Sequence, residues 1–397
     1  MPTLLQINIF NKYSTGKIAE QIGSLAIKHG WNSYFAYSRG SSESESEIIR
    51  IGNNMNVYWH VLETRLFDNH GLASRLATKK FLKQIEKISP DIIHLHNIHG
   101  YYLNYKILFD FLRSYHRPIV WTLHDCWPIT GHCSYFTLAN CNRWKTQCFD
   151  CPLKKDYPGS IMLDHSQKNL QIKKSAFTSI ENLHIVSVSN WLNEIIKNSF
   201  LSYANLYVIH NGIDISNFSP CVKSVNGKKF RILGVSNVWS ERKGLNDFFK
   251  LREQLSDDYN ILLVGLSKKQ LKNLPAGITG IDRTESQSEL AKLYGESDVF
   301  VNTTYADNFP TVNIEALASG TPVITYQTGG SPEAVDEKTG IIVPQGNISE
   351  LVDAIKSLRL HPLKSSDCRE RAEKLYNKDI AFQKYIELYD SILAKRY

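Results

Sequence analysis

Short apolar runs alternate with helix-compatible segments along almost all of the 397 residues. In the first half such runs stand at 4–10, 91–96, 119–123 and 184–188. Most of them are continuously apolar and too short for a buried helix, which is typical of strands covered on both faces of a parallel sheet. The alternation therefore predicts doubly wound α/β architecture and excludes an all-helical or all-β fold.

A second series of the same kind follows the polar stretch 220–229. Its strands are expected at 230–235, 261–264, 299–302, 322–325 and 340–343. Helices are expected near 244–255, 287–294, 310–319 and 348–360, and the segment 368–395 is helix-compatible almost throughout. Two successive series predict two Rossmann-like domains, each built on a parallel sheet.

The composition is that of a soluble globular protein, with 42% hydrophobic and 21% charged residues. The sequence has no apolar run of the roughly 18 residues that span a membrane, and its first residues lack the pattern of a signal peptide. We therefore expect a cytoplasmic protein. The net charge of +7 favours anionic partners, but no nucleic-acid-binding motif accompanies it, so nucleic acid is not an expected partner.

The segment 75–88 has helical periodicity, with Leu76, Phe81, Leu82 and Ile85 broadly on one side and lysines elsewhere. It fits peripheral contact with the inner face of a membrane. A packed helix with a solvated basic face explains the same pattern and is the favoured interpretation.

Two acids surround the start of the expected helix at 310–319: Asp307 before it and Glu315 inside it. The positive end of a helix attracts anions, and carboxylates accept hydrogen bonds from hydroxyl groups. A nucleotide sugar offers a diphosphate and many hydroxyls together. Spacing alone also allows a surface acid followed by an acid in an ordinary helix.

The segment 307–324 resembles the donor-site motif of retaining glycosyltransferases with the GT-B fold, in particular glycosyltransferase family 4. Asp307 stands where the family has its first Glu, and Glu315 fills the second Glu position. The resemblance implies that Glu315 binds the donor ribose and that Asp307, one methylene shorter than Glu, approaches the transferred sugar. It also implies an α/β fold of two facing Rossmann-like domains with an interdomain cleft.

From this resemblance we expect three parts of the chain: an acceptor-binding domain at 1–209, a nucleotide-sugar-binding domain at 210–375, and a C-terminal helix at 376–397 that packs on the N-terminal domain. A Cys-rich insertion is expected at about 126–160.

Arg242 and Lys243 precede a helix after the first strand of the second series, a position that suits a diphosphate. Solvated charges at a helix start are the alternative. The resemblance assigns the donor phosphates to Lys243, with Arg242 replacing a family arginine at the position of Val238. The expected donor-binding residues are Gly16, Arg242, Lys243, Asp307, Asn308, Phe309, Pro310, Thr311, Glu315, Gly329 and Gly330.

His124 and Asp125 end a predicted buried strand and match the family's Thr-X-His-Asp motif. The resemblance therefore adds His124 to the catalytic set of Lys243, Arg242 and Asp307. Acceptor contacts are expected from Lys12, His96, His99 and Asp125. His94 and His96 share one side of their strand, which suits a metal pair, acceptor contact or hydrogen-bonded scaffolding.

Four of the seven cysteines fall close together, and the last two form a Cys-X-X-Cys pair: Cys133, Cys141, Cys148 and Cys151. In a reducing compartment this grouping favours a structural zinc ion over free or redox-active thiols and over disulfides.

The resemblance thus implies a metal-independent glycosyltransferase of the hexosyltransferase type in surface polysaccharide assembly, such as that of capsule. By the resemblance, it transfers a sugar with retention from a nucleoside-diphosphate donor to a carbohydrate or lipid-linked acceptor. A GT-B phosphorylase or epimerase is the alternative enzyme. A catalytically silent nucleotide-sugar-binding protein is the alternative from another class, and Asp307 is its best support.

Overall fold

The computed structural model describes residues 1–40, 43–221 and 229–395, which divide into two compact units. Unit 1 comprises Met1–His210 together with Phe382–Tyr397, and unit 2 comprises Asn211–Ala381. Of the polar stretch 220–229 noted in the sequence, residues 222–228 lie outside the described part.

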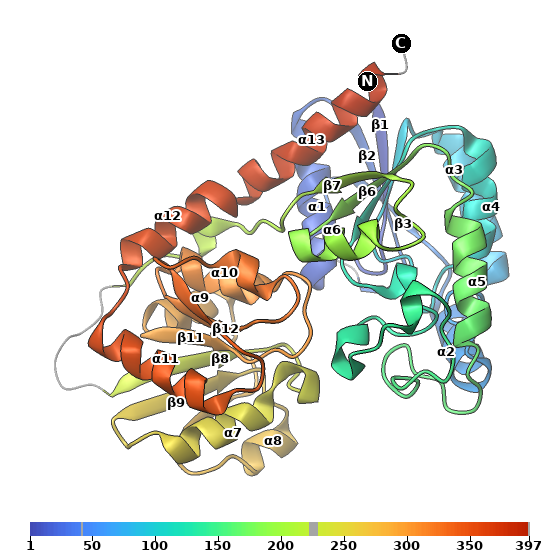
Figure 1. Cartoon of the computed structure of the whole chain (residues 1–397). Coiled ribbons are helices and arrows are strands. Elements are labelled where there is room, and N and C mark those ends of the chain that lie inside the picture. The colour runs from blue at the N-terminus through green and yellow to red at the C-terminus, as the bar shows by residue number, and fades with distance from the viewer. Residues whose placement is uncertain (41–42, 222–228, 396–397) are drawn as a thin grey trace. The chain divides into compact units, whose positions relative to one another are not determined.

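Unit 1 is built on a parallel sheet of seven strands in the order β3-β2-β1-β4-β5-β6-β7 (Figure 1). Its strands are β1 (Thr3–Ile7), β2 (Asn32–Tyr37), β3 (Glu47–Arg50), β4 (Ile92–Leu95), β5 (Ile119–Leu123), β6 (Leu183–Ser187) and β7 (Asn205–Val208). Its helices are α1 (Tyr13–Lys28), α2 (Asn54–Phe67), α3 (Arg75–Ile88), α4 (Tyr105–Tyr115), α5 (Ser166–Phe177) and α6 (Asn190–Lys197). Helix α13 (Lys378–Ala394) begins in unit 2, and its residues from Phe382 onward belong to unit 1.

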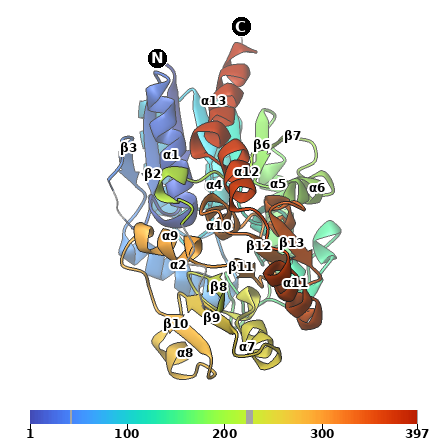
Figure 2. The same ribbon diagram turned by 90° about the vertical axis from the view of Figure 1, so that its left-hand side faces the viewer.

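Unit 2 has a parallel sheet of six strands in the order β10-β9-β8-β11-β12-β13 (Figure 2). Its strands are β8 (Phe230–Val235), β9 (Tyr259–Val264), β10 (Ile278–Ile281), β11 (Val299–Asn302), β12 (Val323–Tyr326) and β13 (Gly340–Val343). Its helices are α7 (Leu245–Gln254), α8 (Lys268–Lys272), α9 (Gln287–Gly295), α10 (Thr311–Ala318), α11 (Ile348–Leu360) and α12 (Ser365–Leu375).

Helices cover both faces of each sheet because the strand order reverses in its middle. In unit 1 the chain moves from β1 outward to β2 and β3, returns to β4 beside β1, and then moves the other way. Right-handed crossovers place the helices of the two directions on opposite faces, so Figure 1 shows α3, α4 and α5 on the far side of the sheet from α1. In unit 2 the same rule separates α7 from α9 and α10 (Figure 2).

The buried strands account for the two cores. Every residue of β4, β5, β6, β11 and β12 is buried, as the continuous apolar runs in the sequence predicted. Short-range contacts set the helix starts: the Ser189 hydroxyl accepts a hydrogen bond from the backbone amide of Leu192 at 3.1 Å and caps the N-terminus of α6. The expected helix at 368–395 is interrupted at Tyr376-Asn377, where Ile213 forms a parallel bridge with Asn377.

Helix α3 buries Phe81 and Ile85 while Leu76 is 82% exposed. The apolar residues of this helix therefore do not form one exposed stripe, and the packed interpretation fits it. Within the described ranges, no helix is both long and apolar enough to cross a bilayer.

Candidate active-site residues

The predicted functional residues gather at the carboxyl ends of strands, on either side of the point where the strand order reverses. In unit 2 that point lies between β8 and β11, and the following loops carry Lys243 and Asp307. In unit 1 it lies between β1 and β4; Gln6 is the last residue but one of β1, and His96 directly follows β4. Open α/β sheets bind ligands at this place because the loops diverge there and leave space above the sheet.

Lys243 and Asp307 form the central charged pair of unit 2. The Lys243 Nζ lies 2.6 Å from the Asp307 Oδ2, and both side chains are less than one-fifth exposed. Their loops are held together through Thr303, whose hydroxyl donates to the carbonyl of Lys243 at 3.0 Å. Gly244 allows this approach, because a Cβ there would lie 2.2 Å from the carbonyl oxygen of Thr303. Backbone packing therefore fixes the lysine beside the carboxylate.

Arg242 adds a second cation on the same side. Its Nη1 donates to the carbonyl of Ala306 at 2.6 Å and lies 3.8 Å from the Asp307 Oδ2. Burial raises the pKa of Asp307, but Lys243 and Arg242 outweigh burial and hold that pKa below its usual value. The carboxylate stays ionised, and with two cations beside it this part of the site carries net positive charge.

Helix α10 presents its N-terminus to this region, beginning at Thr311 after Pro310. The helix is anchored from within by Asn313, whose side chain bonds Asn302 of β11 at 2.8 Å and the Ser331 hydroxyl at 3.0 Å. Glu315 lies one turn further along and accepts a hydrogen bond from the Tyr294 hydroxyl at 3.1 Å. A tyrosine therefore helps to hold the second acid of the motif.

The residues between Asp307 and α10 are buried and position its start. Asn308 and Phe309 are 3% and 4% exposed, and the ring of Phe309 packs 5.7 Å from that of Tyr376. The Asn211 side chain donates to the carbonyl of Phe309 at 3.3 Å. These contacts fix the direction in which the chain enters the helix, which sequence spacing alone does not give.

Gly329 closes the unit 2 site from the loop after β12. Its φ is +55°, and a Cβ at this position would lie 1.8 Å from the carbonyl oxygen of Asp307. Gly330 follows as the residue before the short helix Ser331–Ala334. Only glycine permits this contact, so the structure brings the predicted Gly329 directly against the predicted Asp307.

In unit 1, imidazole rings from neighbouring strands form one hydrogen-bonded chain. The His96 Nδ1 shares a hydrogen bond with the His124 Nε2 at 3.2 Å, and the His96 Nε2 lies 3.1 Å from the Gln6 Oε1. Burial lowers the pKa of His96 well below its usual value and that of His124 to about 4. The imidazole rings of His96 and His124 are therefore neutral at neutral pH.

His94 has a scaffolding environment. Its two ring nitrogens lie 2.6 Å from the hydroxyl of Tyr389 on α13 and 2.7 Å from the Thr122 hydroxyl. Both nitrogens are thus engaged. Among the three interpretations offered for the His94–His96 pair, hydrogen-bonded scaffolding describes the contacts of His94.

Asp125 and His99 form a separate pair. The His99 Nε2 lies 3.1 Å from the Asp125 Oδ2, and the amide of Trp127 donates to the Asp125 Oδ1 at 2.9 Å. Burial raises the pKa of Asp125, but the charge of His99 and the hydrogen bonds from His99 and Trp127 have a larger opposite effect. The pKa of Asp125 therefore lies below its usual value. The aspartate is ionised and held in place, and its charge acts on His124, where it opposes the effect of burial on the imidazole pKa.

Lys12 ends the loop after β1, and Gly16 lies in the first turn of α1. A Cβ on Gly16 would lie 2.8 Å from the carbonyl oxygen of Phe10, so glycine allows α1 to start tightly against this loop. The Lys12 Nζ lies 5.1 Å from the ring centroid of Tyr13. Both residues stand at the carboxyl end of β1, as predicted.

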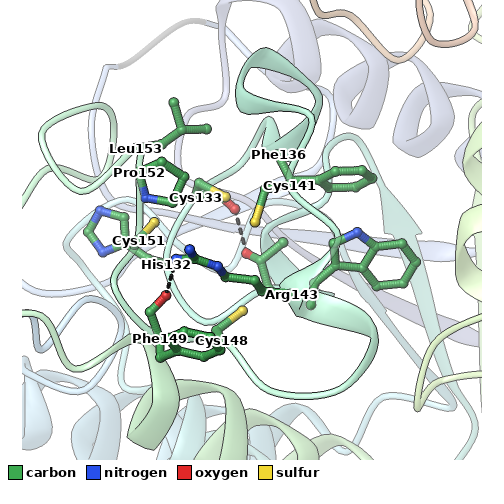
Figure 3. Close-up of a pocket in the computed structure, with 12 residues that line it drawn as sticks. His132, Cys133, Phe136, Cys141, Arg143, Cys148, Phe149, Cys151, Pro152 and Leu153 are labelled. Carbon is green, nitrogen blue, oxygen red and sulfur yellow. Dashed lines mark hydrogen bonds between the residues drawn. The ribbon is translucent and has the colours of Figure 1, made fainter.

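The four cysteines of the insertion line one pocket together with His132 and Thr130 (Figure 3). All four cysteines are free thiols. Across the described ranges, however, no three His, Cys, Asp or Glu side chains already have the arrangement of a metal-coordination sphere. The structure thus gathers the predicted ligands without placing them around a common centre.

Three contributors were missed in the sequence: Gln6, Tyr294 and Tyr389. Gln6 is fully buried in β1, and a polar residue inside an apolar strand is a detectable signal. The two tyrosines contact Glu315 and His94 from helices far away in the sequence, and no local pattern identifies them.

Comparison with known proteins decides the family. The family model described as "Glycosyltransferase Family 4" matches residues 19–217, half of the chain. The chain belongs to glycosyltransferase family 4. The model described as "Glycosyl transferases group 1" matches residues 222–375 of this family 4 protein.

Two curated relatives show how far this family 4 protein resembles others. One, named for colanic acid biosynthesis as glycosyl transferase WcaC of Escherichia coli K12, is 23% identical over 98% of this chain and 100% of its own length. The other is N,N'-diacetylbacillosaminyl-diphospho-undecaprenol alpha-1,3-N-acetylgalactosaminyltransferase of Campylobacter jejuni. It is 26% identical over 59% of this chain and 69% of its own length.

Solved structures agree on the fold. Sucrose-phosphate synthase from Thermosynechococcus elongatus superposes with a TM-score of 0.73 at 16% identity over the full length of both chains. Anabaena Alr3699/HepE in complex with UDP gives 0.66 at 15% identity over 98% of this chain and 100% of its own. The fold of the family 4 protein is GT-B, as the sequence predicted.

Proposed function

We propose that this glycosyltransferase transfers a hexosyl group, with retention of configuration, from a nucleoside-diphosphate sugar. The supporting observation is the charged pair of Lys243 and Asp307 with Arg242 beside it, at the strand ends of unit 2 and next to the start of α10. An anionic diphosphate and a polyhydroxylated sugar match a site with two cations and one fixed carboxylate.

Lys243 and Arg242 would stabilise the leaving diphosphate as the glycosidic bond breaks. Neither cation depends on a bound metal for its position, because Lys243 is held by Thr303 and Asp307 and Arg242 by Ala306. This supports catalysis without a divalent cation. Asp307 would orient the transferred sugar, Glu315 the ribose hydroxyls, and Gly329 and Gly330 would let their amides approach the phosphates.

We assign the donor to unit 2 and the acceptor to unit 1. The neutral rings of His96 and His124 donate and accept hydrogen bonds without favouring an anion, which suits sugar hydroxyls. His124 would contribute to sugar binding and catalysis, while Lys12, His99 and Asp125 would contact the acceptor.

The relatives support polysaccharide assembly and a carbohydrate or lipid-linked acceptor. One is named for colanic acid biosynthesis, and the name of another contains a diphospho-undecaprenol acceptor. An acceptor of this kind resides in a membrane, so the enzyme would work at the membrane surface from the cytoplasmic side.

Helix α2 supports such peripheral contact better than α3, the segment whose sequence pattern raised the possibility of membrane contact. Met55, Tyr58, Trp59 and Leu62 recur at helical spacing and are 74%, 69%, 60% and 45% exposed. Gly52 packs against Ala77, which brings the start of α3 and its exposed lysines beside α2. Trp59→Ser should reduce cosedimentation with vesicles containing anionic phospholipid, and unchanged cosedimentation would count against this surface.

The test of the donor assignment is a thermal-shift and hydrolysis screen against nucleotide sugars with different bases and sugars. We expect at least one donor to raise the unfolding temperature and to release nucleoside diphosphate slowly in the presence of a chelator. Binding without release would favour a silent binding protein. Release that needs inorganic phosphate, or absorbance of a bound pyridoxal group, would favour a phosphorylase.

We also propose that the four cysteines hold a structural zinc ion remote from the transfer chemistry. Thiolates from Cys133, Cys141, Cys148 and Cys151 form a donor set suited to zinc, and they line a single pocket (Figure 3). Zinc binding would require the cysteine side chains to change rotamer so that the sulfurs face a common centre. About one zinc per chain is expected by elemental analysis.

A further inference from the structure

Lys173 is a buried cation without an obvious purpose in the chemistry above. It lies on α5 and is 1% exposed. Its Nζ donates to the carbonyls of Trp127 at 2.7 Å and Thr130 at 2.9 Å and lies 3.5 Å from the Trp127 ring centroid. Taking an ammonium group out of water is costly unless an anion compensates it.

No carboxylate among the described residues lies within ion-pair distance of Lys173. The two nearby aspartates are bound to imidazoles: Asp68 lies 2.7 Å from His132, and Asp125 lies 3.1 Å from His99. Burial accordingly lowers the pKa of Lys173 to about 7, although Cys148 and Cys133 act in the opposite direction. Asp125 and Asp68 also favour the charged lysine, but Cys148 and Cys133 have the larger effects, so the cysteines are its main source of counter-charge.

One peptide group connects the lysine to the cysteine pocket. The carbonyl of Thr130 accepts from the Lys173 Nζ, and the amide of the next residue, Gly131, donates to the Cys148 Sγ at 3.3 Å. These two atoms belong to the same peptide bond. A cation on its oxygen polarises the N–H and strengthens its bond to an anionic sulfur, as in other chains of hydrogen bonds.

We infer that Lys173 is the counter-cation of a zinc–thiolate centre, acting through the Thr130–Gly131 peptide on Cys148. The inference rests on the proposed zinc site. A zinc ion with four thiolates retains negative charge, and a buried centre of this kind needs N–H donors and a nearby positive charge. Lys173 supplies the charge, and Gly131 supplies one of the donors.

The experiment measures zinc content and the rate of zinc transfer to a chromogenic chelator. Lys173→Met keeps the length of the side chain and removes its charge. The matched control is Lys174→Met, the next residue of α5, which is exposed. We expect about one zinc per chain in the native protein, zinc transfer at least about tenfold faster from Lys173→Met, and an unchanged rate from Lys174→Met.

A second variant separates charge from packing. Cys141→His replaces a thiolate by a neutral ligand and so lowers the negative charge of the zinc centre. Added to Lys173→Met, it should partly restore zinc retention. If Lys173→Met alone does not fold, the double variant should fold. A native protein without zinc would overturn the zinc proposal itself. Zinc bound equally well in Lys173→Met, or a loss that Cys141→His leaves unrelieved, would overturn the role of Lys173 alone.

Discussion

The two units place different chemistry at the same topological position. In unit 2 the strand ends carry ionised groups, with Lys243 and Arg242 beside Asp307. In unit 1 they carry the neutral imidazoles of His96 and His124 in a hydrogen-bonded chain. Parallel sheets with a reversal in strand order supply a binding place in both cases, but the loop residues decide which ligand is bound. The contrast fits an anionic donor for unit 2 and a hydroxyl-rich ligand for unit 1.

The largest expected effect comes from removing the cation of unit 2. Lys243→Ala should lower kcat/KM for the donor about a hundredfold or more, because roughly 2–4 kcal/mol of transition-state stabilisation is lost. Steady-state kinetics measure it, with the exposed Lys269→Ala as control. Equal activity in both variants would contradict the claim that the positive charge of unit 2 suits it to an anionic donor.

A methyl group at Gly329 tests whether close backbone contact maintains the charged site. Gly329→Ala should destabilise unit 2 by about 2 kcal/mol or more, because left-handed strain adds to a clash with the Asp307 carbonyl. Gly346→Ala is the control: its φ is also positive, but a Cβ there would meet only the Tyr305 side chain. Urea unfolding of the two variants would show equal losses if the contact at Asp307 were unimportant.

Glu315→Gln keeps the shape of the side chain and removes its charge. Donor KM should rise about tenfold, since a hydrogen bond to a charged group contributes roughly 1.5–3 kcal/mol. The effect should persist when the sugar is absent and only the nucleoside diphosphate binds, because the proposed contact is to ribose. A KM change confined to one sugar would instead place Glu315 at the transferred sugar.

The neutral imidazole rings of unit 1 predict a smaller, pH-dependent effect on the stability of the protein. The folded pKa of His96 lies below that of the unfolded chain, so its contribution to stability is present above about pH 6.5 and is lost as pH falls. Wild type should lose up to about 1.4 kcal/mol more per pH unit below that value than His96→Gln. The control His29→Gln changes an exposed histidine. Parallel pH profiles for His96→Gln and wild type would contradict a neutral ring chain.

Sequence predicted the repeated strand–helix pattern well because parallel strands buried on both faces are continuously apolar. It placed Lys243 and His96 at strand ends for the same reason, and Asp307 before the start of a helix. It did not predict β2 and β3, whose residues mix polar and apolar types; β3 is the edge strand and β2 lies beside it. Nor did it predict that Tyr294 holds Glu315 or that α13 brings Tyr389 to His94, since these contacts join distant segments.

The cysteine segment shows a second limit. Spacing grouped four cysteines that line one pocket in the structure. It gave no sign of Lys173, which bonds the carbonyl of Thr130 in the lining of that pocket. A buried lysine in an amphipathic helix looks like any other lysine until its carbonyl partners are known.

Calorimetric titration of nucleoside diphosphates tests the central claim most directly, with a chelator present to exclude divalent cations. We expect one of the diphosphates to bind wild type, with affinity that falls as ionic strength rises and that drops about tenfold or more in Lys243→Ala. Binding that requires a divalent cation, or that is unchanged in Lys243→Ala, would contradict the assignment of the charged strand ends of unit 2 to the donor.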